Sequence, residues 1–249
     1  MALTDKLTTI ADAIRDKTGG TEAMTLDQMA TEIAGIETGG GVTLEDIAQR
    51  NISGVITLSV SPKDYAFHSC VGITEAIVNS GPINKHAFNG CTGMTRVAST
   101  ASTVLDSAFE GCSALVNVDF PNLIKTNSWA FKGAGIVDVE FPSLSTVGYG
   151  AFYQCKSLKK IDIGVSTTFG NICFQYCSNL DTVILRSSSM VPLANVQCFA
   201  NTPFASGGTG GTVYAPSALI TSYQTETNWS TLYAAGTCNF VAIEGSEYE

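Results

Sequence analysis

The sequence predicts an α/β-class solenoid, built mostly of short parallel β-strands and turns, with a small helical hairpin at its N-terminal end. Three observations predict this fold. A Phe returns every 21 or 22 residues, an apolar pattern typical of a short strand follows each Phe, and the first 36 residues repeat their apolar positions with the period of a helix. A coil of this length cannot bury its own apolar side, so each coil must stack on its neighbours.

The composition fits an ordered protein and excludes several classes. Apolar residues make up 45% of the 249 residues and charged residues 14%. A net charge of −9 with only 13 Lys and Arg argues against binding to nucleic acid or to anionic membranes. No run approaches the roughly 20 apolar residues of a membrane-spanning helix. The opening segment lacks the apolar core of a secretion signal, so we expect synthesis in the cytoplasm.

The first element is a helical hairpin with its linker, predicted over residues 1–38. Its two apolar stripes follow helical spacing, at Leu7, Ile10, Ala11 and Ile14 and at Leu26, Met29, Ala30 and Ile33. Helices of about 12 residues are marginal alone, so we expect the hairpin to dock to the solenoid, to a second copy or to another protein. The Gly-rich run 38–41 predicts a flexible linker.

An N-terminal cap is predicted over residues 42–64. The alternating run from Val55 to Val60 is typical of a strand, and we expect it to close the first coil.

The repeats are predicted over residues 65–204. The recurring Phe stands at Phe67, Phe88, Phe109, Phe131, Phe152, Phe174 and, more loosely, Phe199. Three residues after the first six of these come Cys70, Cys91, Cys112, Ala134, Cys155 and Cys177. An apolar residue then opens a pattern such as Leu115-x-x-Val118-x-Phe120, which is the strand signature of a leucine-rich repeat. A Pro or Gly turn and a second apolar stretch complete each coil, and we expect the Phe to be a core side chain.

The cysteines follow the repeat and therefore indicate packing. Ala134 fills the position that Cys occupies in the other coils, so the position requires a small apolar side chain. Cys173 and Cys198 replace the Ala of the Ala-Phe pair, and no position is predicted for Cys238. Neighbouring coils are close enough for a disulfide, but reduced, buried thiols are favoured. The spacing does not suit zinc, and we expect no metal and no cofactor.

A C-terminal cap is predicted over residues 205–249. Residues 212–216 indicate a last strand, and residues 218–229 indicate a short helix that covers the terminal coil.

The outward positions of the strands are the candidate binding face. They include Glu75, Arg96, Asn117, Asp119, Asp138, Glu140, Lys160 and Asp162. Stacking should gather Asp119, Asp138, Glu140 and Asp162 into an acidic patch. This patch is either a solvated surface or a site for a basic partner, a cation or a glycan. The two histidines occupy different repeat positions and no catalytic motif is present, so we expect no enzymatic activity.

The Ala-Phe-x-x-Cys-x-x-Leu repeat resembles the BspA-type leucine-rich repeats of bacterial and protozoan surface proteins over residues 65–204. Residues 212–232 are similar to the closing segment of such proteins from gut Firmicutes. Residues 3–15 and 26–30 resemble an N-terminal module of tail-associated proteins in prophages of those bacteria.

Together these resemblances imply a non-enzymatic binding protein, phage or prophage tail-associated, that contacts a protein or glycan on a host cell surface. Its location would be the virion, the cell surface or the extracellular space. A bacterial cell-surface or secreted leucine-rich repeat adhesin is the first alternative. A recognition module of a larger enzyme complex is the second.

Overall fold

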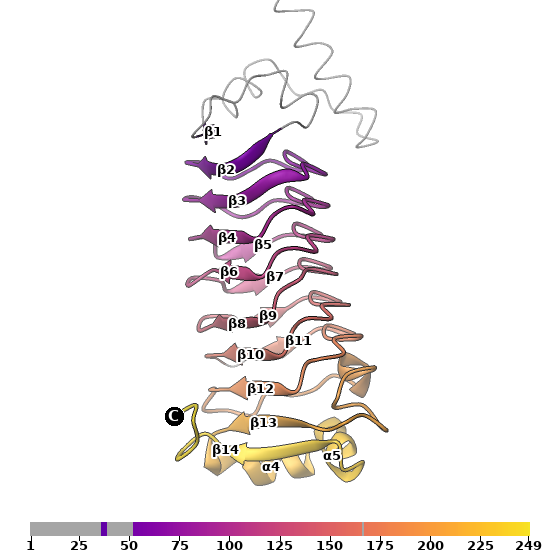
Figure 1. Ribbon diagram of the computed structural model, residues 1–249. Helices are drawn as coiled ribbons and strands as arrows, with labels where there is room; N and C mark the ends of the chain where they lie inside the picture. Colours follow the sequence, from indigo (N-terminus) through magenta and orange to yellow (C-terminus); the bar gives the residue numbers. More distant parts are fainter. Residues whose placement is uncertain (1–35, 39–51, 166) are drawn as a thin grey trace, which may run out of the picture.

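The structure is a computed structural model, and it describes residues 36–38, 52–165 and 167–249. It confirms the leucine-rich repeat solenoid: coils of similar length stack along a single axis, and each adds one strand to a long parallel face (Figure 1). Within the described part of the chain, no helix is long and apolar enough to cross a membrane.

The long face consists of one strand per coil, continued by two strands of the C-terminal cap. These strands are β2 (Ser53–Leu58), β3 (Gly72–Val78), β4 (Arg96–Ser99), β6 (Asn117–Asp119), β8 (Asp138–Phe141), β10 (Lys160–Ile163), β12 (Thr182–Leu185), β13 (Gly211–Ala215) and β14 (Cys238–Ala242). A second, narrower parallel sheet follows the turns, and it consists of β5 (Thr103–Val104), β7 (Lys125–Thr126), β9 (Thr146–Val147) and β11 (Thr168–Phe169).

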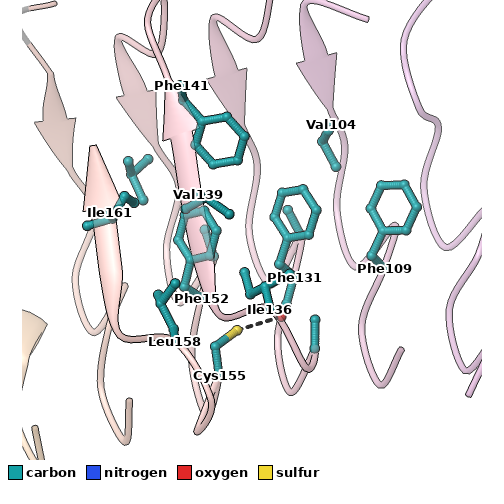
Figure 2. Close-up of a cluster of buried hydrophobic side chains, with 14 of the residues drawn as sticks. Val104, Phe109, Phe131, Ile136, Val139, Phe141, Phe152, Cys155, Leu158 and Ile161 are labelled. Carbon is teal, nitrogen blue, oxygen red and sulfur yellow. Dashed lines mark hydrogen bonds between the residues drawn. The ribbon is translucent and has the colours of Figure 1, made fainter. Parts of the chain in front are cut away.

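The recurring Phe forms the predicted core. All seven rings are buried, and consecutive rings stack nearly face to face with centroids 5.2–5.6 Å apart. Figure 2 shows three of them, Phe109, Phe131 and Phe152, side by side inside the coils. The spacing of the rings follows from the stacking of the coils, because strands in a sheet lie about 4.8 Å apart.

The repeated Cys is buried and reduced, as predicted, and the structure adds a role for its thiol. Cys155 donates its S–H to the backbone carbonyl of Phe131 in the preceding coil, with 3.0 Å between sulfur and oxygen (Figure 2). The same bond of 3.0–3.1 Å recurs at Cys91, Cys112 and Cys177. The position therefore prefers a small side chain that can also donate a weak hydrogen bond.

The turns on both sides of the first six Phe residues of the ladder, and the turn after Phe199, each contain a residue in the left-handed backbone conformation. Glycine takes it without steric cost, but several positions carry side chains. The residues with positive φ that are not glycine are Tyr65, Ser69, His86, Ser107, Trp129, Gln154, Ile172, Tyr176 and Asn201.

The coil that begins at Phe131 departs from the others. Six residues separate Phe109 from Leu115, whereas only five separate Phe131 from Ile136. The turn that follows Cys112 in the preceding coil is absent after Ala134. As a consequence the long face is divided into two sheets, one ending at β6 and the other at β8, and no ladder pairing joins these two strands among the described residues.

The N-terminal boundary differs from the prediction. Residues 36–38, expected at the end of the hairpin and the start of its linker, form strand β1 (Ile36–Thr38), which pairs antiparallel with β2. This pairing covers the first edge of the long face, where unpaired backbone groups would otherwise remain. The predicted strand of the cap is confirmed as β2. The rest of the predicted hairpin and linker, and the first part of the cap, lie outside the described residues.

The C-terminal cap contains more helices and strands than predicted. The expected helix over 218–229 is two helices, α4 (Ile220–Thr225) and α5 (Thr227–Ala234), which follow the short 3-10 helices η1 (Val196–Phe199) and η2 (Ser217–Leu219). The two helices are separated at Glu226, whose side chain accepts hydrogen bonds from the backbone N–H groups of Asn228 and Trp229 in the first turn of α5. The strand over 212–216 is not the last one, because β14 follows the helices and pairs parallel with β13. Cys238 opens β14 and is buried.

A candidate binding groove on the strand face

The register of the strands places the predicted site residues in columns on the long face. Glu75, Arg96 and Asn117 lie opposite one another across β3, β4 and β6. On the other side of the break, Asp138 lies opposite Lys160, and Glu140 lies opposite Asp162. The prediction that these residues share one face is therefore met within each of the two sheets.

The break between β6 and β8 opens a depression of about 480 Å³ on this face, which we call the strand-face groove. It is lined by Val118, Asp119, Phe120, Pro121, Asp138, Val139, Glu140, Pro142 and Lys160. Phe120 and Val139 are buried and provide apolar surface, while the carboxylates lie around them. The groove therefore combines an apolar floor with a charged rim, as binding sites commonly do.

The rim of the groove is acidic. Its lining carries three carboxylates, Asp119, Asp138 and Glu140, and one ammonium group, that of Lys160, which leaves a net charge of −2 (−3 + 1) on these residues. The Asp119 side chain is 66% exposed and lies 3.9 Å from the Arg96 guanidinium, which also pairs with Glu75. The Lys160 ammonium lies 5.7 Å from the centre of the Tyr248 ring.

No ion pair engages Asp138 or Glu140 within the described residues. Both side chains belong to exposed residues, so their charge is available to a ligand.

Asp162 does not belong to the acidic patch, contrary to the prediction. It is only 6% exposed, and Arg186 holds both of its carboxylate oxygens at 2.8 and 2.9 Å. The hydrogen bond to Asp162 raises the pKa of the Arg186 guanidinium. Arg186 also donates to the backbone carbonyl of Tyr248 at 2.9 Å. The C-terminal residues at Tyr248 thus contact the face beside the groove through Arg186. Ile184, which lies opposite Asp162 in the register, is also buried.

Arg186 and Tyr248 contact the strand face without having been predicted from the sequence. The sequence does contain an indication of the role of Arg186. This residue follows β12 at the position where the preceding strands end in a turn-forming residue, Pro121, Pro142 or Gly164. A charged residue in place of a turn former at this position indicates a tertiary contact. Tyr248 lies outside the repeats and has no counterpart, so no pattern points to it.

The groove is not arranged as a metal site. Among the residues that the structure describes, no group of three or more His, Cys, Asp or Glu is placed to hold a metal ion.

Comparison with known families gives the repeat its identity. The family described as BspA type leucine rich repeat region (6 copies) matches residues 60–133 and 102–207. The chain belongs to the BspA-type leucine-rich repeat family. None of the curated proteins compared with this BspA-type chain matches it.

Solved structures of leucine-rich repeat proteins are similar to this chain. One from Bacteroides ovatus is 23% identical, with a TM-score of 0.51 over 66% of this chain and 44% of its own. One from Eubacterium ventriosum is 25% identical, with a TM-score of 0.46 over 55% of this chain and 40% of its own. One from T. pallidum is 20% identical, with a TM-score of 0.48 over 81% and 95%. This BspA-type chain spans less than half the length of the first two.

Proposed function

We propose that this chain is a non-enzymatic binding protein that holds a basic protein segment of a cell-surface partner in the strand-face groove. The observation that carries the proposal is the coincidence of two features: the long face is interrupted between β6 and β8, and the resulting depression is lined by exposed carboxylates. A regular coil stack would present a flat, ladder-paired surface there, without a pocket for a side chain.

A Lys or Arg side chain matches the chemistry of the groove. Its aliphatic stem would lie against Val118 and Val139, and its charged head would reach the carboxylates of Asp138 and Glu140. Because the carboxylates are exposed, their attraction for the partner is screened by salt within about 10 Å at 0.1 M. Binding should therefore weaken as the salt concentration rises.

The groove can be tested with substitutions that change charge and leave shape intact. Asp138→Asn together with Glu140→Gln removes two charges from the rim at almost constant volume. Asp181→Asn, which neutralises an exposed carboxylate outside the groove lining, is the matched control. The purified chain and both variants would be titrated against intact bacterial cells by flow cytometry, with soluble oligolysine as competitor.

We expect the double variant to lose at least about tenfold in affinity and the control to bind as the unaltered chain does. Oligolysine should compete for the unaltered chain. Equal binding by the double variant would show that the groove is not the site. Loss of binding after periodate treatment of the cells, with no competition by oligolysine, would point to a glycan and overturn the choice of a protein partner.

A second variant changes shape and leaves charge intact. Inserting one Ser after Ala134 restores the six-residue step of the other coils, so it should extend the β4–β6 ladder to β8 and close the groove. Loss of binding in this variant, with its circular dichroism unchanged, would assign the interaction to the groove and not to the overall charge of the face.

We further propose that a prophage tail carries the chain, with the N-terminal residues as the docking element. The resemblance of residues 3–15 and 26–30 to prophage tail-associated proteins supports this carrier. Deleting residues 1–35 removes that segment and retains β1, which pairs with β2. In a pull-down from lysates of induced lysogens, the full chain should retain tail proteins and the shortened chain should not. Equal recovery would favour the alternative, a bacterial surface adhesin.

A further inference from the structure

The sulfurs of Cys173 and Cys198 make a contact that differs from the one made by four cysteines of the repeats. Cys91, Cys112, Cys155 and Cys177 each direct the S–H to a backbone carbonyl of the preceding coil. The thiols of Cys173 and Cys198 instead face each other, with 2.7 Å between the two sulfur atoms. This separation is about 0.7 Å longer than a disulfide bond of ~2.04 Å.

The positions of the two residues allow a bond. Cys173 and Cys198 directly precede Phe174 and Phe199, whose rings stack at 5.4 Å on consecutive coils. A coil spacing of about 4.8 Å falls within the range of Cα separations that a disulfide can bridge. In the five preceding coils Ala occupies this position, at Ala66, Ala87, Ala108, Ala130 and Ala151. Only the last two coils therefore carry a Cys at this position, one in each coil.

We propose that Cys173 and Cys198 form a disulfide that links the last two coils when the chain meets an oxidising environment. The reaction needs an oxidant, and a small disulfide of the glutathione type suffices. One Cys thiolate attacks this disulfide, giving a mixed disulfide and one small thiol. The second Cys thiolate then displaces the second small thiol. The protein loses two hydrogens and two electrons, and the oxidant gains them as two thiols.

The place of the bond explains what it would do. Cys198 lies in η1, which follows the last regular coil and contacts α5 of the cap. The bond would join the regular stack to the segment that closes it, where repeat-to-repeat packing ends. Removing freedom from the unfolded chain is the main way a disulfide stabilises a fold.

Access controls when the bond forms. Cys173 is 0% exposed and Cys198 is 1% exposed, and burial raises the pKa of the Cys173 thiol well above its usual value. Thiolate is the reactive form, so attack on an oxidant is slow in the folded chain. The bond should form while the chain folds, before the last coils close over the thiols.

Mass spectrometry tests the proposal on the full chain. The unfolded, reduced chain would be refolded with reduced and oxidised glutathione, unfolded again in iodoacetamide, and weighed. We expect six alkylated cysteines and one disulfide. Trypsin cuts at Arg186, between the two cysteines, and chymotrypsin cuts at Tyr176, between Cys173 and Cys177, so the linked peptides identify the pair.

The oxidised chain should also unfold at a temperature about 5 °C or more above that of the reduced chain. Cys155→Ala serves as the control and should retain the bond, whereas Cys173→Ala should leave seven alkylated cysteines. Eight alkylated cysteines in the oxidised chain, or a bond between Cys155 and Cys177, would overturn the proposal. Because the unaltered chain alone gives this result, the test stands even if a variant fails to fold.

Discussion

Phe109→Ala should destabilise the solenoid more than truncation of Phe67, at the N-terminal end of the Phe ladder. Phe109 is fully buried, and its ring stacks on Phe88 at 5.4 Å and on Phe131 at 5.3 Å. Truncating a core Phe to Ala costs about 3–5 kcal/mol, and a ring pair contributes about 0.5–1.5 kcal/mol beyond its buried area. With a ring on each side, the cavity cannot collapse, so we expect a loss in the upper half of that range, about 4–5 kcal/mol.

Phe67→Ala is the matched comparison. Phe67 stacks on one ring of the ladder, that of Phe88 at 5.2 Å, and lies in the first regular coil. Its truncation should cost about 1 kcal/mol less, because one ring contact fewer is lost. Urea unfolding followed by far-ultraviolet circular dichroism would give both free energies. An equal cost at the two positions, or a cost below about 2 kcal/mol at Phe109, would refute the view that stacking of the rings stabilises the core.

Three further outcomes follow from single contacts. Ile172 is a β-branched residue at φ 53°. Replacing Ile172 with Gly should stabilise the fold by about 0.5–1 kcal/mol and raise the midpoint of thermal unfolding. A lower midpoint would show that the packing of the Ile172 side chain outweighs its backbone strain. Trp229→Phe removes the 2.8 Å bond from the indole N–H to the Val191 carbonyl and should cost about 1–3 kcal/mol in urea unfolding, whereas no loss would mean that water replaces the bond. Burial alone would raise the pKa of Glu110, but hydrogen bonds from Lys132 and Ser107 hold this pKa below its ordinary value. The stability that the Glu110 carboxylate contributes is therefore present above the unfolded pKa and lost as pH falls through the folded pKa. Glu110→Gln should cost less than about 1 kcal/mol at pH 7 and nothing at pH ~2, and an equal cost at both pH values would contradict this.

The repeat could be predicted because it is carried by local periodicity. Each Phe and each strand position returns at nearly constant spacing, and identical coils must stack with corresponding side chains in contact. The shortened coil after Phe131 is also visible in the sequence, as five residues to Ile136 where the preceding coil has six. Its consequence, a divided face, was not predicted, because a change of one residue alters strand pairing only through the three-dimensional path of the turn.

The acidic rim was predicted in part. Asp138 and Glu140 are exposed and lie with Asp119 around the groove, as stacking requires. Asp162 occupies the position equivalent to Glu140 but is paired with Arg186 and buried. Arg186 is in turn bound by the C-terminal residue Tyr248, which folds back onto the face. That contact joins residues from outside the repeat to residues within it, and repeat periodicity contains no information about such pairs.

The two departures from regularity have opposite physical effects. At the break between β6 and β8 a residue is missing, and the ladder that satisfies the strand face elsewhere is interrupted. At Cys173 and Cys198 a larger, reactive side chain replaces Ala, and the two sulfur atoms add a contact between consecutive coils. A stack of equal coils repeats the same backbone path at each step, so its face changes shape only where one coil differs. The groove is that difference, and the coils between it and the cap hold its second wall in place.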